Sequence, residues 1–133
     1  MKCMVVTPEK TVIDVETTFV VLPLYDGEMG IGLGHTPLIG RLGVGELRIT
    51  PPEGPVLSYY VEGGFAEVRE ERISLLTNRA IRSSELNVLE IQQSLEAAQA
   101  RPNNTPKLAE LKTKALQIAK AQLHLAQKKK SAR

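Results

Sequence analysis

Several residue types are scarce in this chain, and each scarcity excludes a class of protein. Tryptophan is absent and aromatic residues make up 4% of the 133 residues, so the core must consist mainly of valine, isoleucine and leucine. The single cysteine, Cys3, cannot form an internal disulfide, so nothing indicates an oxidising compartment. Its apolar surroundings, CMVV, predict a buried and inert thiol, because a reactive cysteine needs cationic or histidine neighbours.

Long apolar runs are also missing. The first ten residues, MKCMVVTPEK, contain an apolar run too short for a secretory signal. No window approaches the roughly 18 apolar residues that a membrane-spanning helix requires. We therefore expect a soluble protein that reaches a membrane only through a partner.

Clusters of catalytic or metal-binding residues are absent as well. The two histidines, His35 and His124, lie far apart, and no cysteine or histidine stands at the spacing of a metal site. The glycines of residues 27–34 lack the terminal Gly-Lys-Ser/Thr of a phosphate loop and a following helix. We expect them to form turns. The sequence thus predicts no enzyme, no cofactor and no metal.

Charge is distributed unevenly along the chain. Residues 1–100 hold 8 Lys and Arg against 14 Asp and Glu, although the whole chain has a net charge of +2. Residues 101–133 hold 9 Lys and Arg and a single acidic residue, Glu110. We expect the basic region to contact acidic surfaces, and the acidic region not to bind nucleic acid.

Up to about residue 82 the sequence predicts short β-strands separated by turns. In ELRIT, for example, Leu47 and Ile49 share one face and polar side chains occupy the other. The pair Gly63-Gly64 predicts a tight connection. Short strands without intervening helices favour an antiparallel sandwich or barrel. The predicted strands lie within residues 3–7, 11–16, 18–24, 46–50, 56–62, 65–70 and 72–77.

After residue 82 the apolar period becomes that of a helix. Asn87 followed by Glu90 resembles a helix-start box, with Ser84 as a competing cap. Residues 101–106 then interrupt the pattern with two prolines. The first helix face consists of Val88, Ile91, Leu95 and Ala98. A second helix is predicted over residues 107–128, with an apolar face of Leu108, Leu111, Ala115, Ile118 and Leu125, interrupted by Gln122, and a second stripe of Leu116, Ala119, Leu123 and Ala126.

Two helices joined by so short a loop should pack as an antiparallel hairpin. The seam is rich in alanine, which buries little apolar surface at about 25 cal/mol per Å². We therefore hypothesise that residues 84–133 form a marginally stable element that can dock, detach and dock again. Uniformly strong hydrogen-exchange protection across residues 86–128 would count against this hypothesis.

The stretch from Asp26 to Thr50 resembles the ε subunit of bacterial and chloroplast F-type ATP synthases. The family motifs G-E-x-G-I, G-H-x-P-L and G-x-x-x-I stand here at residues 27–31, 34–38 and 45–49. Residues 63–65 resemble the Gly-Gly strand turn of that family, and residues 78–81 resemble its T-x-A strand end. The resemblance implies a β-sandwich over residues 1–83 and a helical hairpin with a basic C-terminus over residues 84–133.

This resemblance also implies a place in the rotor of the enzyme. The sandwich would hold the foot of the γ subunit and rest on the membrane c-ring, at the cytoplasmic face of a bacterial inner membrane or, less favoured, at the stromal face of a chloroplast thylakoid. The hairpin could extend toward the α/β catalytic head and restrain ATP hydrolysis. The chain itself would be a non-catalytic subunit of proton-driven ATP synthesis.

Particular residues are expected to carry these contacts. Glu28 and His35, on the two motif loops, are candidates for charge-assisted hydrogen bonds to the c-ring, although both could serve only local structure. The basic residues of the hairpin are candidates for docking on the catalytic head, or are simply solvated. They are Lys112, Lys114, Lys120, Lys128, Lys129, Lys130 and Arg133.

Some family members bind ATP through an I/L-D-x-x-R-A motif in the first helix, but here Asn87, Glu90 and Ile91 replace its Asp, Arg and Ala, which argues against ATP sensing.

The main alternative function is a β-sandwich binding module whose basic helical tail targets nucleic acid or anionic membranes. The tail, however, has no aromatic residues for stacking on bases.

Overall fold

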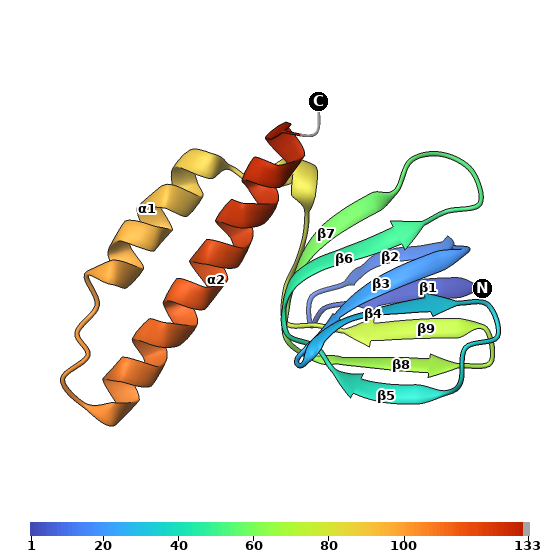
Figure 1. The fold of residues 1–133 in the computed structure, drawn as a ribbon, viewed down its shortest axis with the longest axis horizontal. Coiled ribbons are helices and arrows are strands. Elements are labelled where there is room, and N and C mark those ends of the chain that lie inside the picture. Colours follow the sequence, from blue (N-terminus) through green and yellow to red (C-terminus); the bar gives the residue numbers. More distant parts are fainter. Residues whose placement is uncertain (132–133) are drawn as a thin grey trace. The chain divides into compact units, whose positions relative to one another are not determined.

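The computed structural model describes the backbone of residues 1–131 and the side chains of residues 1–128. The chain forms two compact units, Met1–Arg82 and Ser83–Arg133. Figure 1 shows that the first unit is built from strands and the second from helices. Within the described part, no helix is both long enough and apolar enough to cross a bilayer.

The first unit is a sandwich of two five-stranded sheets, as predicted. One sheet has the order β2-β1-β9-β8-β5 and the other β10-β7-β6-β3-β4. Every neighbouring pair is antiparallel except β1 and β9, which run parallel. The strands are β1 (Lys2–Val6), β2 (Thr11–Glu16), β3 (Phe19–Leu24), β4 (Gly27–Gly32), β5 (Leu38–Arg41), β6 (Val44–Thr50), β7 (Leu57–Glu62), β8 (Phe65–Arg69), β9 (Arg72–Leu76) and β10 (Ala80–Arg82).

Alternating side chains from both sheets fill the core between them. Leu47 and Ile49 of β6 are fully buried, which confirms the face predicted from ELRIT. Opposite them, Val5 and Leu75 come from the other sheet. Cys3 is buried in the same core, and this desolvation, helped by the charge of Asp14, raises the pKa of its thiol to about 12. The predicted burial of the thiol is confirmed.

Three strands, β4, β5 and the short β10, were not among the predicted strands. The sequence assigned residues 27–34 to turns, and that assignment is wrong for Gly27–Gly32 because these residues pair with β3. Phe19 of β3 lies over the glycines of β4, and a Cβ added at Gly30 would come within 2.5 Å of its ring. Glycine therefore provides room for an aromatic ring here, while Gly27 and Gly34 have the positive φ expected of turns.

Two connections between the sheets meet at one end of the sandwich. Residues 42–43 lead from β5 to β6, and residues 63–64 lead from β7 to β8. Leu42 donates its N–H to the carbonyl of Gly64 at 2.8 Å, and Gly63 donates to Gly43 at 3.0 Å. Each connection thus satisfies the backbone of the other, which fixes where the chain changes sheets.

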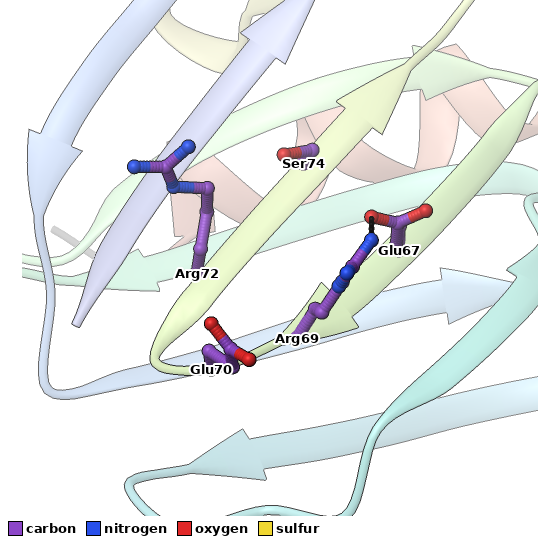
Figure 2. A pocket seen from close by; sticks show the side chains of 5 residues that line it. All are labelled: Glu67, Arg69, Glu70, Arg72 and Ser74. Carbon is purple, nitrogen blue, oxygen red and sulfur yellow. Dashed lines mark ion pairs between the residues drawn. The ribbon is translucent and has the colours of Figure 1, made fainter.

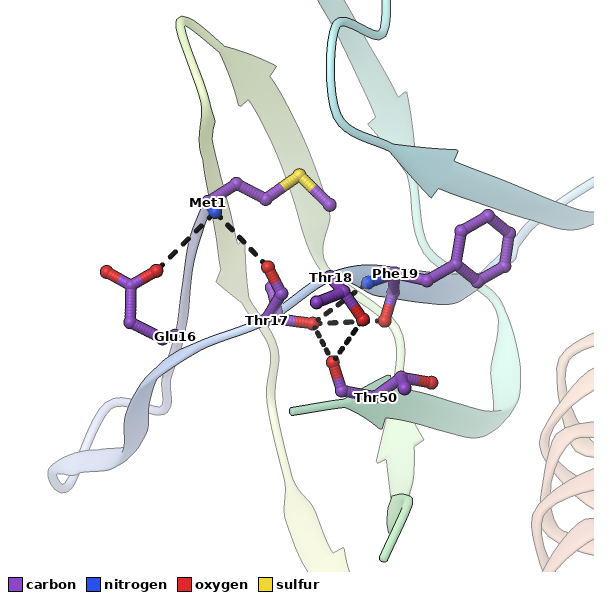
Figure 3. A network of polar contacts seen from close by, with 6 residues as sticks. All are labelled: Met1, Glu16, Thr17, Thr18, Phe19 and Thr50. Carbon is purple, nitrogen blue, oxygen red and sulfur yellow. Dashed lines mark hydrogen bonds and ion pairs between the residues drawn. The ribbon is translucent and has the colours of Figure 1, made fainter. Parts of the chain in front are cut away.

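A polar network secures another connection, from β2 to β3 (Figure 3). The buried hydroxyl of Thr17 lies 2.7 Å from the carbonyl of Thr50 and accepts the N–H of Phe19 at 3.3 Å. Thr18, beside it, reaches the same carbonyl at 3.3 Å from an exposed position. The terminal ammonium of Met1 donates a hydrogen bond to the carbonyl of Thr17 at 3.2 Å.

We predict that Thr17→Val lowers the free energy of unfolding by about 1–3 kcal/mol, because it leaves buried partners without their hydrogen bonds at nearly constant side-chain volume. Thr18→Val is the matched control and should cost less than about 0.5 kcal/mol, since its hydroxyl is exposed. Urea unfolding of both full-length variants measures the difference. Equal costs would show that the buried hydroxyl contributes nothing particular.

The second unit contains a short 3₁₀ helix, Ser83–Glu85, followed by α1 (Val88–Gln99) and α2 (Pro106–Ser131). The side chain of Asn87 accepts the N–H of Glu90 at 3.2 Å, which confirms the predicted N-cap. Thr105 caps α2 by accepting the N–H of Leu108 at 3.2 Å. Figure 1 shows α1 and α2 lying side by side in opposite directions, so the predicted hairpin is confirmed.

The buried residues of the hairpin follow the predicted faces with two differences. In α1, Ile91 and Ala98 are buried, as expected. In α2, Gln122 is buried even though it was expected to interrupt the apolar face. Leu111, which the predicted face included, is 44% exposed in the second turn of α2. Small residues, Ala119 and Ala126, make up much of the buried surface.

Candidate functional site

Glu28, one of the two predicted contact residues, lies on β4 and not on a turn. Its carboxylate is exposed and accepts a hydrogen bond from Arg48 of β6, with 3.1 Å between Nη1 and Oε2. In the register of the sheet, Glu28 pairs with Pro23 and Arg48 pairs with Val21, both on β3. The ion pair therefore passes diagonally over β3 on the outer face of this sheet.

Arg48 is held from a second side. Its Nη1 lies 3.0 Å from Oε1 of Glu46, and Glu46 accepts a 2.6 Å hydrogen bond from Ser58 of β7 on its other oxygen. Partial burial lowers the pKa of Arg48, but the hydrogen bonds and charges of Glu46 and Glu28 outweigh it, so this pKa lies above its ordinary value. Glu28, Arg48, Glu46 and Ser58 form one chain of polar contacts, which we call the Arg48 network.

His35, the other predicted contact residue, lies in the connection between β4 and β5. Its backbone N–H bonds the carbonyl of Gly32 at 3.2 Å, and Gly34 has a φ of +80°, which is the geometry of a type II turn. Nδ1 of His35 lies 2.7 Å from the carbonyl of Thr36. The turn presents Leu33 at its corner, 70% exposed.

The structure does not bring Glu28 and His35 together. Glu28 is near the first residue of β4, and His35 follows the last. A strand rises about 3.3 Å per residue, so Glu28 and Gly32 alone are separated by roughly 13 Å. The expectation that both residues contact the c-ring remains a prediction, and it requires a partner surface that spans both positions.

An exposed apolar row crosses the outer face of the other sheet. Register pairs place Arg41, Phe65, Leu76 and Val6 side by side on β5, β8, β9 and β1. Phe65 is 59% exposed and Leu76 is 61% exposed. Together with Thr7, Pro8 and Asn78 these residues line an open hollow of about 770 Å³. We call this surface the apolar row.

The apolar row has the composition of a protein interface. The guanidinium of Arg41 stacks 4.4 Å above the ring of the exposed Tyr25. Aromatic residues and arginine are the residues most enriched where proteins bind one another. The apolar row was not predicted, although Phe65 and Leu76 occupy positions in their strands where side chains face solvent, and the sequence contained this signal.

A smaller hollow of about 370 Å³ lies farther along the same sheet and is charged (Figure 2). Arg69 of β8 and Arg72 of β9 are partners in the strand register, and the guanidinium of Arg69 lies 4.0 Å from the carboxylate of Glu67. Glu70 and Glu71 form the turn between the two strands with positive φ values of 46° and 64°. Glu67 and Glu70 line this hollow together with the two arginines, so its charge is mixed.

The hairpin lysines are only partly described. Lys114, Lys120 and Lys128 are exposed, and Lys112 is half-buried. The side chains of Lys129, Lys130 and Arg133 lie outside the described residues. Docking of these lysines on the catalytic head remains a prediction.

The three positions that depart from the ATP motif have structural roles here. Asn87 caps α1, Glu90 donates its N–H to that cap, and Ile91 is buried. Among the described residues no group of three or more His, Cys, Asp or Glu could hold a metal ion.

Comparison with known proteins identifies the family of both parts of the chain. Residues 1–83 match the family model described as ATP synthase, Delta/Epsilon chain, beta-sandwich domain. The ATP synthase epsilon chain of Rhodopirellula baltica is 44% identical over 123 residues, which cover 92% of this chain and 95% of that protein. The ATP synthase epsilon chain of Carboxydothermus hydrogenoformans is 42% identical over 101 residues, 76% of this chain and 75% of its own.

Solved structures show the same fold at lower identity. A chain of the Euglena gracilis mitochondrial ATP synthase, in an OSCP/F1/c-ring structure, matches with a TM-score of 0.78 at 22% identity, covering 90% of this chain and 76% of its own. A chain of the Tetrahymena thermophila mitochondrial ATP synthase central stalk and c-ring matches with a TM-score of 0.70 at 12% identity, covering 95% and 96%. The chain therefore belongs to the ATP synthase δ/ε family, and it is an epsilon chain, a non-catalytic subunit of the ATP synthase.

Proposed function

We propose that this chain is a rotor subunit of the central stalk, which couples the γ subunit and the membrane c-ring to the α/β catalytic head during proton-driven ATP synthesis. The observation that carries the proposal is the 44% identity to an epsilon chain over 92% of this chain, which includes the hairpin as well as the sandwich. The central-stalk setting of one of the structural matches agrees with it.

The apolar row is the surface that we assign to γ. Phe65 and Leu76 expose a large part of their apolar side chains, and burying them at an interface would contribute about 25 cal/mol per Å² before the costs of association. Arg41 and Asn78 supply polar groups at the rim. A stable contact here would hold the sandwich to its partner without any catalytic group.

The exposed side chain of Glu28 and the half-buried side chain of His35 are assigned to the c-ring. A carboxylate and an imidazole on fixed backbone positions suit hydrogen bonding to polar loops. Under this proposal the chain is a peripheral subunit at the cytoplasmic face of a bacterial inner membrane, and the bacterial sources of its relatives support that location.

The hairpin is assigned to regulation. Its net positive charge would attract acidic segments of the catalytic head, and its small-residue seam would cost little to rearrange. Extension of residues 84–133 along γ would then restrain ATP hydrolysis.

Removing residues 84–133 from the assembled enzyme tests this regulatory part. We expect the truncated subunit to remain bound to γ, because the surface assigned to γ lies on β1, β5, β8 and β9, and we expect hydrolysis to become about two- to tenfold faster. An increase of tenfold corresponds to about 1.4 kcal/mol of lost restraint. Unchanged hydrolysis, with the subunit still bound, would remove the regulatory role and leave the rotor role intact.

A further inference from the structure

The Arg48 network gives Glu28 a fixed position before any partner binds. We propose that Arg48 is a positioning residue for Glu28: it holds one carboxylate oxygen so that the other is presented to a hydrogen-bond donor on the polar loops of the c-ring. This inference rests on the proposed function, in which Glu28 contacts that ring.

The first support is the way Arg48 itself is anchored. It bonds Glu46 at 3.0 Å, and Glu46 is bonded in turn by Ser58 at 2.6 Å. The side chain of Glu46 is 15% exposed and that of Arg48 is 32% exposed, so this end of the network is shielded from water. Charge-assisted hydrogen bonds are stronger than neutral ones, and partial burial limits their screening.

The second support is the geometry at Glu28. Oε2 lies 3.1 Å from Arg48, whereas Oε1 has no hydrogen-bond partner among the residues that the structure describes. The side chain is 56% exposed, so this second oxygen is open to a donor from outside. Two carboxylates and one guanidinium leave the network with one negative charge, which favours a cationic or N–H donor.

The third support is energetic. A free glutamate on an edge strand loses rotamer freedom when a partner orders it, and this loss opposes binding. Arg48 removes part of this freedom in the unbound protein, so the cost at binding is smaller. The same arginine could instead compete with the partner for the carboxylate. The two roles differ in sign, because loss of a positioning residue weakens binding and loss of a competitor strengthens it.

A double-mutant cycle distinguishes these roles. The full-length chain is bound to γ and titrated with the detergent-solubilised c-ring of the same source, for wild type, Glu28→Gln, Arg48→Met and the double variant. We expect Glu28→Gln to weaken binding about tenfold and Arg48→Met about fivefold. In the double variant, loss of Arg48 should have no further effect on binding, because there is no carboxylate left to position.

Two controls separate positioning from stability and from general charge. Thermal unfolding measures the stability of each variant. In the Glu28→Gln background, Arg48→Met should still destabilise the sandwich, because it removes the contact with Glu46. Its effect on binding to the c-ring should disappear in the same background. Arg69→Met removes another arginine that is paired with a glutamate, on the opposite sheet, and should leave binding unchanged.

The possible outcomes separate the positioning role of Arg48 from the c-ring contact of Glu28. If Arg48→Met strengthens binding or leaves it unchanged while Glu28→Gln weakens it, Arg48 is not a positioning residue, although the c-ring contact stands. If Arg48→Met weakens binding equally in both backgrounds, or Arg69→Met matches it, the effect does not act through Glu28. If Glu28→Gln has no effect, the contact assigned to Glu28 is itself wrong.

Discussion

Gly64→Ala is expected to lower the free energy of unfolding by more than about 4 kcal/mol, enough to leave little folded protein. Gly64 has a φ of +102°, which residues other than glycine rarely adopt. A Cβ there would overlap the carbonyl of Leu76 and lie 2.8 Å from Cα of Thr77. Both groups belong to the backbone, so the clash could be relieved only by moving the end of β9 away from the connection between β7 and β8.

Gly54→Ala provides the matched control for this prediction. Gly54 has a similar φ of +95°, but no atom lies within 4 Å of the added Cβ. The variant should therefore cost only the backbone strain, about 1–2 kcal/mol. Urea unfolding and soluble yield of the two full-length variants measure the difference, and equal destabilisation would mean that close backbone approach at Gly64 is unimportant.

The second large effect concerns the apolar row. We expect the pair of substitutions Phe65→Asp and Leu76→Asp to weaken binding to γ at least about 100-fold, because two exposed anchors would become charges that γ must desolvate. Both side chains point to solvent in the free chain, so the fold should be kept, and circular dichroism would check this. Binding is measured by titration with purified γ.

Val56→Asp is the control for the row. Val56 is 52% exposed and lies between β6 and β7, away from the row, so binding to γ should change less than about twofold. If this control weakens binding as much as the double variant, the added charge acts nonspecifically. If the double variant binds like wild type, γ does not contact the row.

Sequence periodicity predicted the strands whose side chains alternate. ELRIT became β6 with its two apolar residues in the core, and the hairpin followed the helical spacing from the N-cap Asn87 onward. These elements were predictable because burial of one face is encoded locally. β4 was missed because four of its six residues have weak strand propensity or are glycine, and its stability comes from pairing with β3 and from the ring of Phe19.

The candidate site was less predictable than the fold. Family motifs pointed to Glu28 and His35, but not to their separation along β4. The partner of Glu28 is 20 positions away, and only the order of strands in the sheet brings Arg48 within 3.1 Å. The apolar row likewise depends on register across four strands, including one parallel pair that no local pattern specifies.

Co-purification with γ shows whether this chain is a rotor subunit. The full-length chain would be expressed with tagged γ and with the catalytic head from its own source, and complexes with and without γ would be compared. The rotor assignment predicts one copy retained per γ, with or without the head, and no retention by the head when γ is absent. Failure to bind γ, or equal retention by the head without γ, would contradict it.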